Sequence, residues 1–252
     1  MKKYFAGIIV LTFIIPNAWG EISIQNDQMY IGDDGITHIV GEVVNDLDVP
    51  LNHIQINASL FSEYNQLLDK ISSKALVHNI MPGMKAPFDI IINKDSLKEF
   101  DRYDLGLEYD VSSPKNQVID ITSSKLSRDN FNNLVITGTV ANNGEITANM
   151  ISIVATLYDK QGNVAAVSKS QAEVDYLRAS DESFFLVSVP DKSQTNSAVD
   201  YSLIAESEEY AAVPEFPLGS GILLAASVFG YIILTKYWNQ AITNVVAAVD
   251  LR

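Results

Sequence analysis

One histidine and two methionines form the clearest candidate metal site in this sequence. His78, Met81 and Met84 follow one another at three-residue intervals. An imidazole and two thioethers make a soft ligand set that suits Cu(I). The alternative is a plain turn between two strands, because Pro82 and Gly83 lie within the same stretch and both residue types favour turns. Copper binding and a simple turn are therefore both open.

Short acidic pairs offer a harder ligand set. Asp33 and Asp34 are adjacent, and Asp46 and Asp48 are separated by one residue. Carboxylate oxygens suit Ca²⁺, but the sequence has no twelve-residue EF-hand loop. Dispersed carboxylates more often form a solvated surface. A calcium-binding module is thus an alternative, and we expect no resident cofactor.

The sequence lacks the residue sets typical of an active site. It has no cysteine, and its three histidines are His38, His53 and His78. It contains neither the nucleophile elbow of serine hydrolases nor the zinc-protease motif nor a phosphate-binding glycine loop. His38 and His53 each precede an inward apolar residue, so we expect both to face solvent. We predict a non-enzymatic protein without a small-molecule substrate.

The overall charge excludes another class of partner. The 252 residues include 17 Lys and Arg against 31 Asp and Glu, a net charge of -14. Binding to a phosphate backbone requires clustered positive charge. We therefore expect no nucleic-acid partner.

The N-terminal residues have the pattern of a secretory signal. Two lysines precede an apolar run at 4–15, and Ala18 and Gly20 fit the small-residue rule for cleavage. The run is too short for a membrane span, which needs roughly 20 residues. The sequence predicts a signal peptide at 1–20.

A second apolar stretch has the length of a transmembrane helix. Residues 218–235 contain no charge, and Lys236 follows them directly. Eighteen such residues lie within the range of about 17–25 that spans a bilayer. The positive-inside tendency then places 21–217 outside the cell and a tail, 236–252, inside. We expect a single-pass protein of the plasma membrane whose exposed part has 13 positive and 30 negative residues.

The predicted ectodomain consists of two tandem copies of one sequence unit. Residues 39–60 align with 136–157 at a shift of 97, without gaps and with nine of 22 positions identical. The identical pairs are Ile39/Ile136, Gly41/Gly138, Val43/Val140, Asn45/Asn142, Asn52/Asn149, Ile54/Ile151, Ile56/Ile153, Ala58/Ala155 and Leu60/Leu157. Duplication explains such a match, so we predict domains at 21–113 and 118–204, and a polar stalk at 205–217.

Each copy has the pattern of β structure. Apolar and other residues alternate along 54–60 and along 151–157, which is typical of strands with one buried face. Turn residues such as Asp159-Lys160-Gln161-Gly162 separate these runs. Several short strands in about 95 residues indicate a β-sandwich. The predicted fold class is all-β, with two tandem sandwiches and one C-terminal transmembrane α-helix.

The second copy resembles a known family of extracellular domains. Gly138-Thr139-Val140-Ala141-Asn142, followed by a strand ending in Leu157-Tyr158-Asp159, is similar to the FxLYD-type domain, with Ala155 in place of the leading Phe. In the first copy, Pro82-Gly83 followed by Phe88 also fits the family pattern. The resemblance implies an immunoglobulin-like sandwich and no particular activity.

The residues before the predicted span resemble a sorting signal. Pro214, Glu215, Phe216 and Pro217 are similar to the PEF-type C-terminal motif of archaeal surface proteins. This resemblance implies a cell-surface location in an archaeon.

One sequon offers a modification site. Asn57-Ala58-Ser59 matches the Asn-x-Ser/Thr acceptor for N-glycosylation. Strand alternation places Asn57 on the outward face and Ala58 inside. A glycan on Asn57 is therefore expected to be sterically possible.

Three functional hypotheses remain open from the sequence. The first is a membrane-anchored surface protein that presents two β-sandwiches for protein interaction or envelope structure. The second is an accessory single-pass subunit of a membrane complex. The third is an extracellular copper- or calcium-binding module. The first two imply partners among other envelope or membrane proteins.

Overall fold

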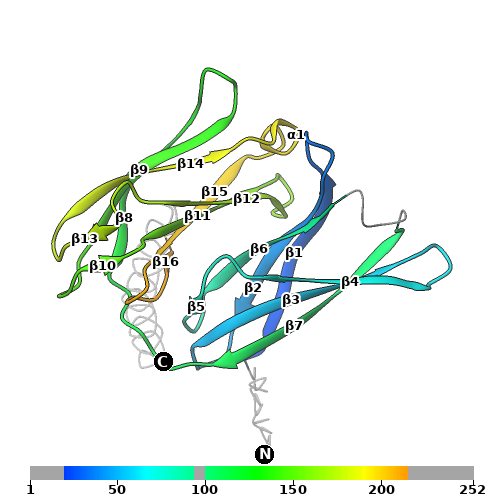
Figure 1. The fold of residues 1–252 in the computed structure, drawn as a ribbon, viewed down its shortest axis with the longest axis horizontal. Coiled ribbons are helices and arrows are strands. Elements are labelled where there is room, and N and C mark those ends of the chain that lie inside the picture. Colours follow the sequence, from blue (N-terminus) through cyan, green and yellow to red (C-terminus); the bar gives the residue numbers. More distant parts are fainter. Residues whose placement is uncertain (1–19, 94–99, 215–252) are drawn as a thin grey trace, which may run out of the picture.

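The computed structural model describes residues 20–93 and 100–214 (Figure 1). The predicted span and tail, and all of the predicted signal peptide except Gly20, lie outside these residues. Within the described residues, no helix has the length and apolarity needed to cross a bilayer.

The described chain is all-β, as predicted, with one four-residue helix. The first seven strands are β1 Ile22–Ile31, β2 Thr37–Asn45, β3 Leu51–Phe61, β4 Leu67–Lys74, β5 Asn79–Ile80, β6 Lys85–Ile92 and β7 Arg102–Val111. We call them the first repeat. The second repeat comprises β8 Ile119–Arg128, β9 Leu134–Asn142, β10 Ala148–Asn149, β11 Ser152–Tyr158, β12 Val164–Gln171, β13 Tyr176–Leu177, β14 Glu182–Val189, α1 Lys192–Thr195, β15 Asp200–Glu206 and β16 Val213–Pro214.

Strand positions recur between the repeats at the shift found in the sequence. β1, β2, β4, β5 and β6 begin and end 97 residues before β8, β9, β12, β13 and β14. The single strand β3 corresponds to β10 and β11 together. A positive-φ residue lies at the same place in both repeats, His53 with φ 48° and Met150 with φ 51°. The strand is interrupted there in the second repeat, and in the first its register with β7 shifts. A backbone irregularity is thus kept although the residue type has changed.

In each repeat two antiparallel sheets enclose a core, and the second repeat also has the two-stranded sheet β10-β13. In the first repeat β1-β2-β6 faces a sheet in which β3 pairs with β4, β5 and β7. In the second repeat β14-β9-β8 faces β12-β11-β15-β16. Apolar side chains from both sheets meet in one cluster per repeat, which includes Ile39, Ile56 and Phe88 in the first and Ile136, Ile153 and Phe185 in the second. Burial of this apolar area is the main stabilising term.

A glycine and a phenylalanine face each other in both cores. Gly41 of β2 pairs with Phe88 of β6, and Gly138 of β9 pairs with Phe185 of β14. A Cβ atom on either glycine would lie 2.7 Å from the Cζ atom of its phenylalanine ring. Glycine is needed at both positions because the ring lies directly over the backbone.

Two buried asparagines perform the same structural task. Asn45 and Asn142 are both fully buried. The Nδ2 atom of Asn45 donates to the carbonyls of Val49 and Ile80, at 2.9 and 3.2 Å. The Nδ2 atom of Asn142 donates to the two carbonyls at the equivalent positions, at 2.8 and 2.9 Å. Each amide therefore joins the loop after its own strand to β5 or β13, which explains why both copies keep it.

The predicted alternation holds in β3 but not in β11. In β3, Ile56 and Ala58 are fully buried and Asn57 lies on the outer side. In β11 the expected outward residues Val154 and Thr156 are also buried. The reason is tertiary: Val154 belongs to the core cluster of the first repeat, together with Ile204 and Ala212. The second repeat covers the outer face of the β1-β2-β6 sheet, with β12 lying against β1, β2 and β6.

The described part of the predicted stalk is folded onto the second repeat, which corrects that expectation. Ala205 and Glu206 complete β15, and Val213 and Pro214 return beside it as β16. The intervening Ala211 and Ala212 are fully buried. Two alanines and a buried tyrosine, Tyr210, give this segment enough apolar surface to pack, although its composition reads as a linker.

A cleft between the repeats as the candidate functional site

A buried carboxylate of the first repeat makes a polar contact with the second repeat. Glu42 on β2 is only 1% exposed, and its Oε2 atom accepts a hydrogen bond of 2.8 Å from Lys85 Nζ. Its other oxygen accepts from the hydroxyl of Tyr158 in the second repeat. Burial and the nearby Glu42 carboxylate raise the pKa of the Tyr158 hydroxyl well above its usual value. These contacts compensate for the desolvation of the Glu42 carboxylate.

A second polar contact joins the repeats at the far end of the molecule, where α1 lies beside the turn after β1 (Figure 1). The backbone N–H of Lys192 donates to Asp33 Oδ2 at 3.0 Å, and the backbone N–H of Asp33 donates to Asp191 Oδ2 at 3.3 Å. Asp191 is also the N-cap residue of α1. Asp33 is therefore used in an inter-repeat contact.

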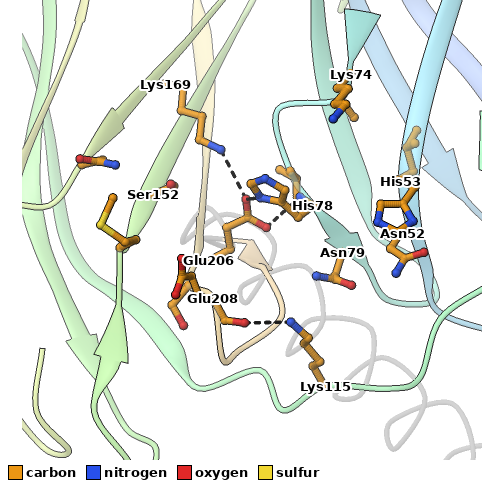
Figure 2. Close-up of a pocket in the computed structure, with 16 residues that line it drawn as sticks. Asn52, His53, Lys74, His78, Asn79, Lys115, Ser152, Lys169, Glu206 and Glu208 are labelled. Carbon is orange, nitrogen blue, oxygen red and sulfur yellow. Dashed lines mark hydrogen bonds and ion pairs between the residues drawn. The ribbon is translucent and has the colours of Figure 1, made fainter. Parts of the chain in front are cut away.

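A cleft of about 700 Å³ lies between these repeats and forms the candidate site. The first repeat provides the ends of β3, β4 and β5, and the second provides β11, β12 and the turn after β15. Figure 2 shows that labelled side chains from both repeats surround the cleft. Its polar lining includes Asn52, His53, Lys74, His78, Asn79, Lys115, Lys169, Gln171, Glu206 and Glu208.

A buried carboxylate ties the two walls of the cleft together. The side chain of Glu206, at the end of β15, is 3% exposed. Its Oε1 atom lies 2.7 Å from His78 Nδ1 and its Oε2 atom accepts the backbone N–H of His78 at 2.9 Å. Lys169 Nζ lies 3.5 Å from Oε1 and donates to the carbonyl of Leu76 at 2.7 Å. Glu206 thus acts as a link between the repeats, with both oxygens occupied (Figure 2).

Further donors line the rest of the cleft. Lys115, in the segment that connects the repeats, donates to the backbone carbonyl of Glu208 at 2.9 Å. The side-chain ammonium of Lys74, at the end of β4, has no hydrogen bond or ion pair with any described residue. His53 is largely exposed, and its Nδ1 atom lies 3.0 Å from Asp110 Oδ2. The arrangement can therefore offer ammonium and imidazole groups to a bound molecule.

The predicted copper ligands have separate partners in the structure. His78 contacts Glu206, whereas the buried Met84 receives the Nε2 donor of Gln117 at its sulfur, at 3.0 Å. Met81 packs against the apolar core of the first repeat. No group of three or more His, Asp or Glu residues close enough to hold a metal ion occurs in the described part of the chain. Copper binding by these residues stays a prediction.

Two histidines that were expected to face solvent differ in their environments. His53 is exposed, as the alternation predicts. His38 is not, because its side chain is only 16% exposed, stacks on Tyr30 at 4.9 Å and lies 2.9 Å from Asp89 Oδ1. The hydrogen bond that the His38 imidazole donates to the Asp89 carboxylate raises the pKa of His38. The adjoining second repeat contributes Asp191 to the charges that act on this imidazole.

The predicted glycosylation residue lies on the outer face of β3. Asn57 Nδ2, the atom that would carry a glycan, donates to Glu108 Oε1 at 3.0 Å. Its Oδ1 atom accepts from Ser72 Oγ at 2.5 Å and from Gln55 Nε2 at 3.2 Å. Modification of Asn57 stays a prediction. Of the predicted sorting motif, Pro214 ends β16, and Glu215, Phe216 and Pro217 lie outside the described residues.

Sequence reasoning missed most of the cleft. Of the lining residues, only His78 was predicted to bind a ligand, and that ligand was copper; the structure pairs His78 with Glu206 instead. Glu206 and Lys169 lie 37 residues apart, and Glu206 is 128 residues from His78. The sequence signal that could have found them is a difference in residue type at equivalent positions of the two repeats. At the shift of 97, Asp175 is the counterpart of His78, and Ser72 is the counterpart of Lys169. Residues that differ between repeats mark the surfaces that the repeats use differently.

Comparison with protein families gives a partial match. Residues 117–205, which correspond to most of the second repeat, match the model of a family described as a protein of unknown function, DUF3426. A search of curated proteins finds no significant relative.

Solved structures show only a distant likeness. An exo-chitosanase of Amycolatopsis orientalis aligns with 78% of this chain and 26% of its own, with a TM-score of 0.30 and 9% identity. A red sea bream transglutaminase aligns with 77% and 30%, with a TM-score of 0.23 and 8% identity. A Bacteroides uniformis β-glucuronidase aligns with 76% and 27%, with a TM-score of 0.27 and 11% identity. The chain spans about a quarter to three tenths of these proteins.

Proposed function

We propose that the chain is a non-enzymatic, membrane-anchored surface protein that presents two immunoglobulin-like β-sandwiches outside the cell as a joined pair. The observation that carries the proposal is the inter-repeat contact, in which Val154, Ile204 and Ala212 of the second repeat pack into the core cluster of the first. Glu42 and Glu206 add buried polar links. Such a contact favours two repeats held together as one unit over two domains that move independently.

The proposed location is supported by the sequence. The signal pattern at 1–20, the apolar stretch at 218–235 and the motif from Pro214 to Pro217 all favour export and anchoring. The absence of cysteine fits domains that fold on their own cores, and each repeat has such a core. Export to an oxidising compartment therefore poses no redox problem for this chain.

Protease treatment of intact cells tests the location. The full chain, with an epitope tag after Arg252, is expressed in a host with a secretory membrane and compared with a variant that lacks residues 218–235. We expect the full chain to resist extraction by carbonate and to lose both repeats to external protease, while the tag stays protected. The deletion variant should be released. A full chain found in the soluble cytoplasmic fraction would contradict the proposal.

Partner identification uses the same membranes. The tagged chain is extracted in mild detergent and its oligomeric state and co-purifying proteins are determined. Recovery mainly as a single species supports the proposed surface protein. A stoichiometric heteromer would instead support an accessory subunit of a membrane complex. Mass analysis of both termini and of Asn57→Gln also reports signal cleavage, sorting and glycosylation.

A further inference from the structure

The lining of the cleft is positive in a strongly acidic chain. Three of the eight lysines in the described residues, Lys74, Lys115 and Lys169, line it. The two lining carboxylates belong to Glu206 and Glu208, so the lining has a net charge of +1 with histidine neutral. The predicted ectodomain as a whole has 13 positive and 30 negative residues. The cleft is therefore a positively charged part of an otherwise acidic surface, and this charge favours an anionic ligand.

Two of these ammonium groups keep their charge available. Lys169 is used by Glu206, but Lys115 donates to a backbone carbonyl, which is a neutral acceptor. The ammonium group of Lys74 has no partner among the described residues. The carboxylate of Glu208 lies on an exposed turn, where water screens its effect. Lys74 and Lys115 can thus form charge-assisted hydrogen bonds with a ligand.

The repeats themselves indicate which anion fits. Asn149 in the second repeat binds a carboxylate: its Nδ2 atom donates to Glu209 Oε1 at 2.5 Å and its backbone N–H donates to Oε2 at 2.8 Å. The equivalent residue of the first repeat, Asn52, lines the cleft. There Asp110 of β7 pairs with Asn52 across the strands, but its Oδ2 atom lies 3.0 Å from His53 Nδ1. Among the described residues, no carboxylate forms a hydrogen bond with the Asn52 side-chain amide. Its Oδ1 atom is buried without a hydrogen-bond partner among the described residues, and the Asn52 side chain lies at the wall of the cleft (Figure 2).

We propose that the cleft binds a small carboxylate-bearing molecule, such as a sugar acid or a dicarboxylate, through Lys74, Lys115 and the Asn52 amide. A volume of about 700 Å³ lies in the range of about 300–1,000 Å³ that is typical of small-molecule sites. Glu206, His78 and Lys169 set the distance between the walls. The ligand would bridge the repeats and stabilise their arrangement, a role that goes beyond surface presentation and does not depend on the membrane location.

Calorimetric titration of the full chain in detergent tests this assignment. The probes are glucuronate and glutarate, with glucose as the matched uncharged control and sulfate as a control for any anion. We expect both carboxylates to bind, glucose not to bind, and sulfate to bind at least about tenfold more weakly than glucuronate. Binding of glucose as tight as that of glucuronate would overturn the proposal. Equal binding of sulfate would indicate an adventitious anion site only and would also overturn it.

Matched lysine variants locate the binding. Lys74→Met and Lys115→Met together should weaken glucuronate binding by about tenfold or more, because two charge-assisted bonds are lost. The control combines Lys125→Met and Lys160→Met, which remove the same charge from the second repeat outside the cleft. Lys74→Met alone should weaken binding without affecting folding, since the ammonium group of Lys74 has no partner among the described residues. Equal affinities in the cleft and control variants would refute the site.

Discussion

The two repeats differ least in their cores and most where they touch. Gly41 and Gly138 occupy equivalent positions in the cores, as do the buried amides of Asn45 and Asn142. At the contact between the repeats, Glu42 has Thr139 as its counterpart. Core residues have the same packing environment in both repeats, so their types are the same. A residue at the contact packs against the other repeat, whereas its counterpart has no such neighbour, so the two residue types differ.

This difference explains the asymmetry of the Tyr158 position. Tyr158 reaches across to Glu42, whereas its counterpart, Phe61, lies under the guanidinium of Arg102, which is 4.0 Å from the ring centroid. The aromatic ring is common to both repeats, and the hydroxyl is present only where a buried carboxylate needs a donor. The motif tyrosine of the second repeat is therefore part of the contact between repeats.

The largest effect is expected from removing the buried carboxylate of the contact. Glu42→Ala leaves the Tyr158 hydroxyl and Lys85 without their acceptor, and losing one partner of a buried pair costs about 3–5 kcal/mol. The partial exposure of Lys85 places the expected loss near the lower limit. Denaturant unfolding measures it. Thr139→Ala at the equivalent position should cost less than about 1 kcal/mol, and equal costs would contradict the comparison.

Replacing the core glycine by alanine should destabilise the second repeat more than the first. Gly138→Ala would place a Cβ atom 2.1 Å from the backbone oxygen of Ser123, in addition to the Phe185 ring. Gly41→Ala would meet side-chain atoms of Phe88 and Asp27, the nearest at 2.7 Å. Backbone yields less readily than side chains, so we expect losses of about 3 and about 1–2 kcal/mol respectively. Thermal unfolding of both variants checks the order, and a more damaging Gly41→Ala would show it to be wrong.

The asparagines should behave alike. Asn45→Ala and Asn142→Ala each remove an amide that donates to two backbone carbonyls and accepts one backbone N–H. Leaving such buried groups unpaired should cost about 2 kcal/mol in either repeat. Urea unfolding of the two variants measures both costs. A difference larger than about 1 kcal/mol would show that the repeats do not use this amide equivalently.

The smallest expected effect is a pH dependence confined to the first repeat. The pKa of His38 is raised by its hydrogen bond to Asp89, with Asp34 and Asp191 adding to the effect. Protonated His38 therefore stabilises the fold below its ordinary pKa of about 6.5, and this contribution is lost as the pH rises through the raised value.

Replacing His38 by the equivalent residue of the second repeat isolates the pH-dependent contribution of His38 to stability. His38→Val copies Val135. Relative to this variant, the wild type should lose about 1 kcal/mol or less between pH 6 and pH 8.5. Melting temperatures at the two pH values report the change. A wild type that gains stability relative to the variant over this range would contradict the sign.

Particular residues show where sequence reasoning succeeded. The alternation of Ile56, Asn57 and Ala58 predicted the faces of β3, because that strand has solvent on its outer side. The same reasoning failed for Val154 and Thr156 of β11, because a neighbouring repeat covers their outer side. Period-two patterns report one buried face, and a second covered face is invisible to them. For the same reason the sequence predicts a polar stalk at 205–217, although Ala205 and Glu206 belong to β15.

The sequence alone determined the β architecture and its repetition at 97 residues, since both depend on local periodicity and on residue identities within one copy. Only the tertiary structure decided how the copies pack and what the cleft contains. Glu206 and His78 are 128 residues apart, and no local pattern distinguishes a carboxylate that will be buried by a neighbouring repeat from one that stays in water. The choice is made by the free energy of burying Val154, Ile204 and Ala212 against the first repeat, which brings those charged groups together.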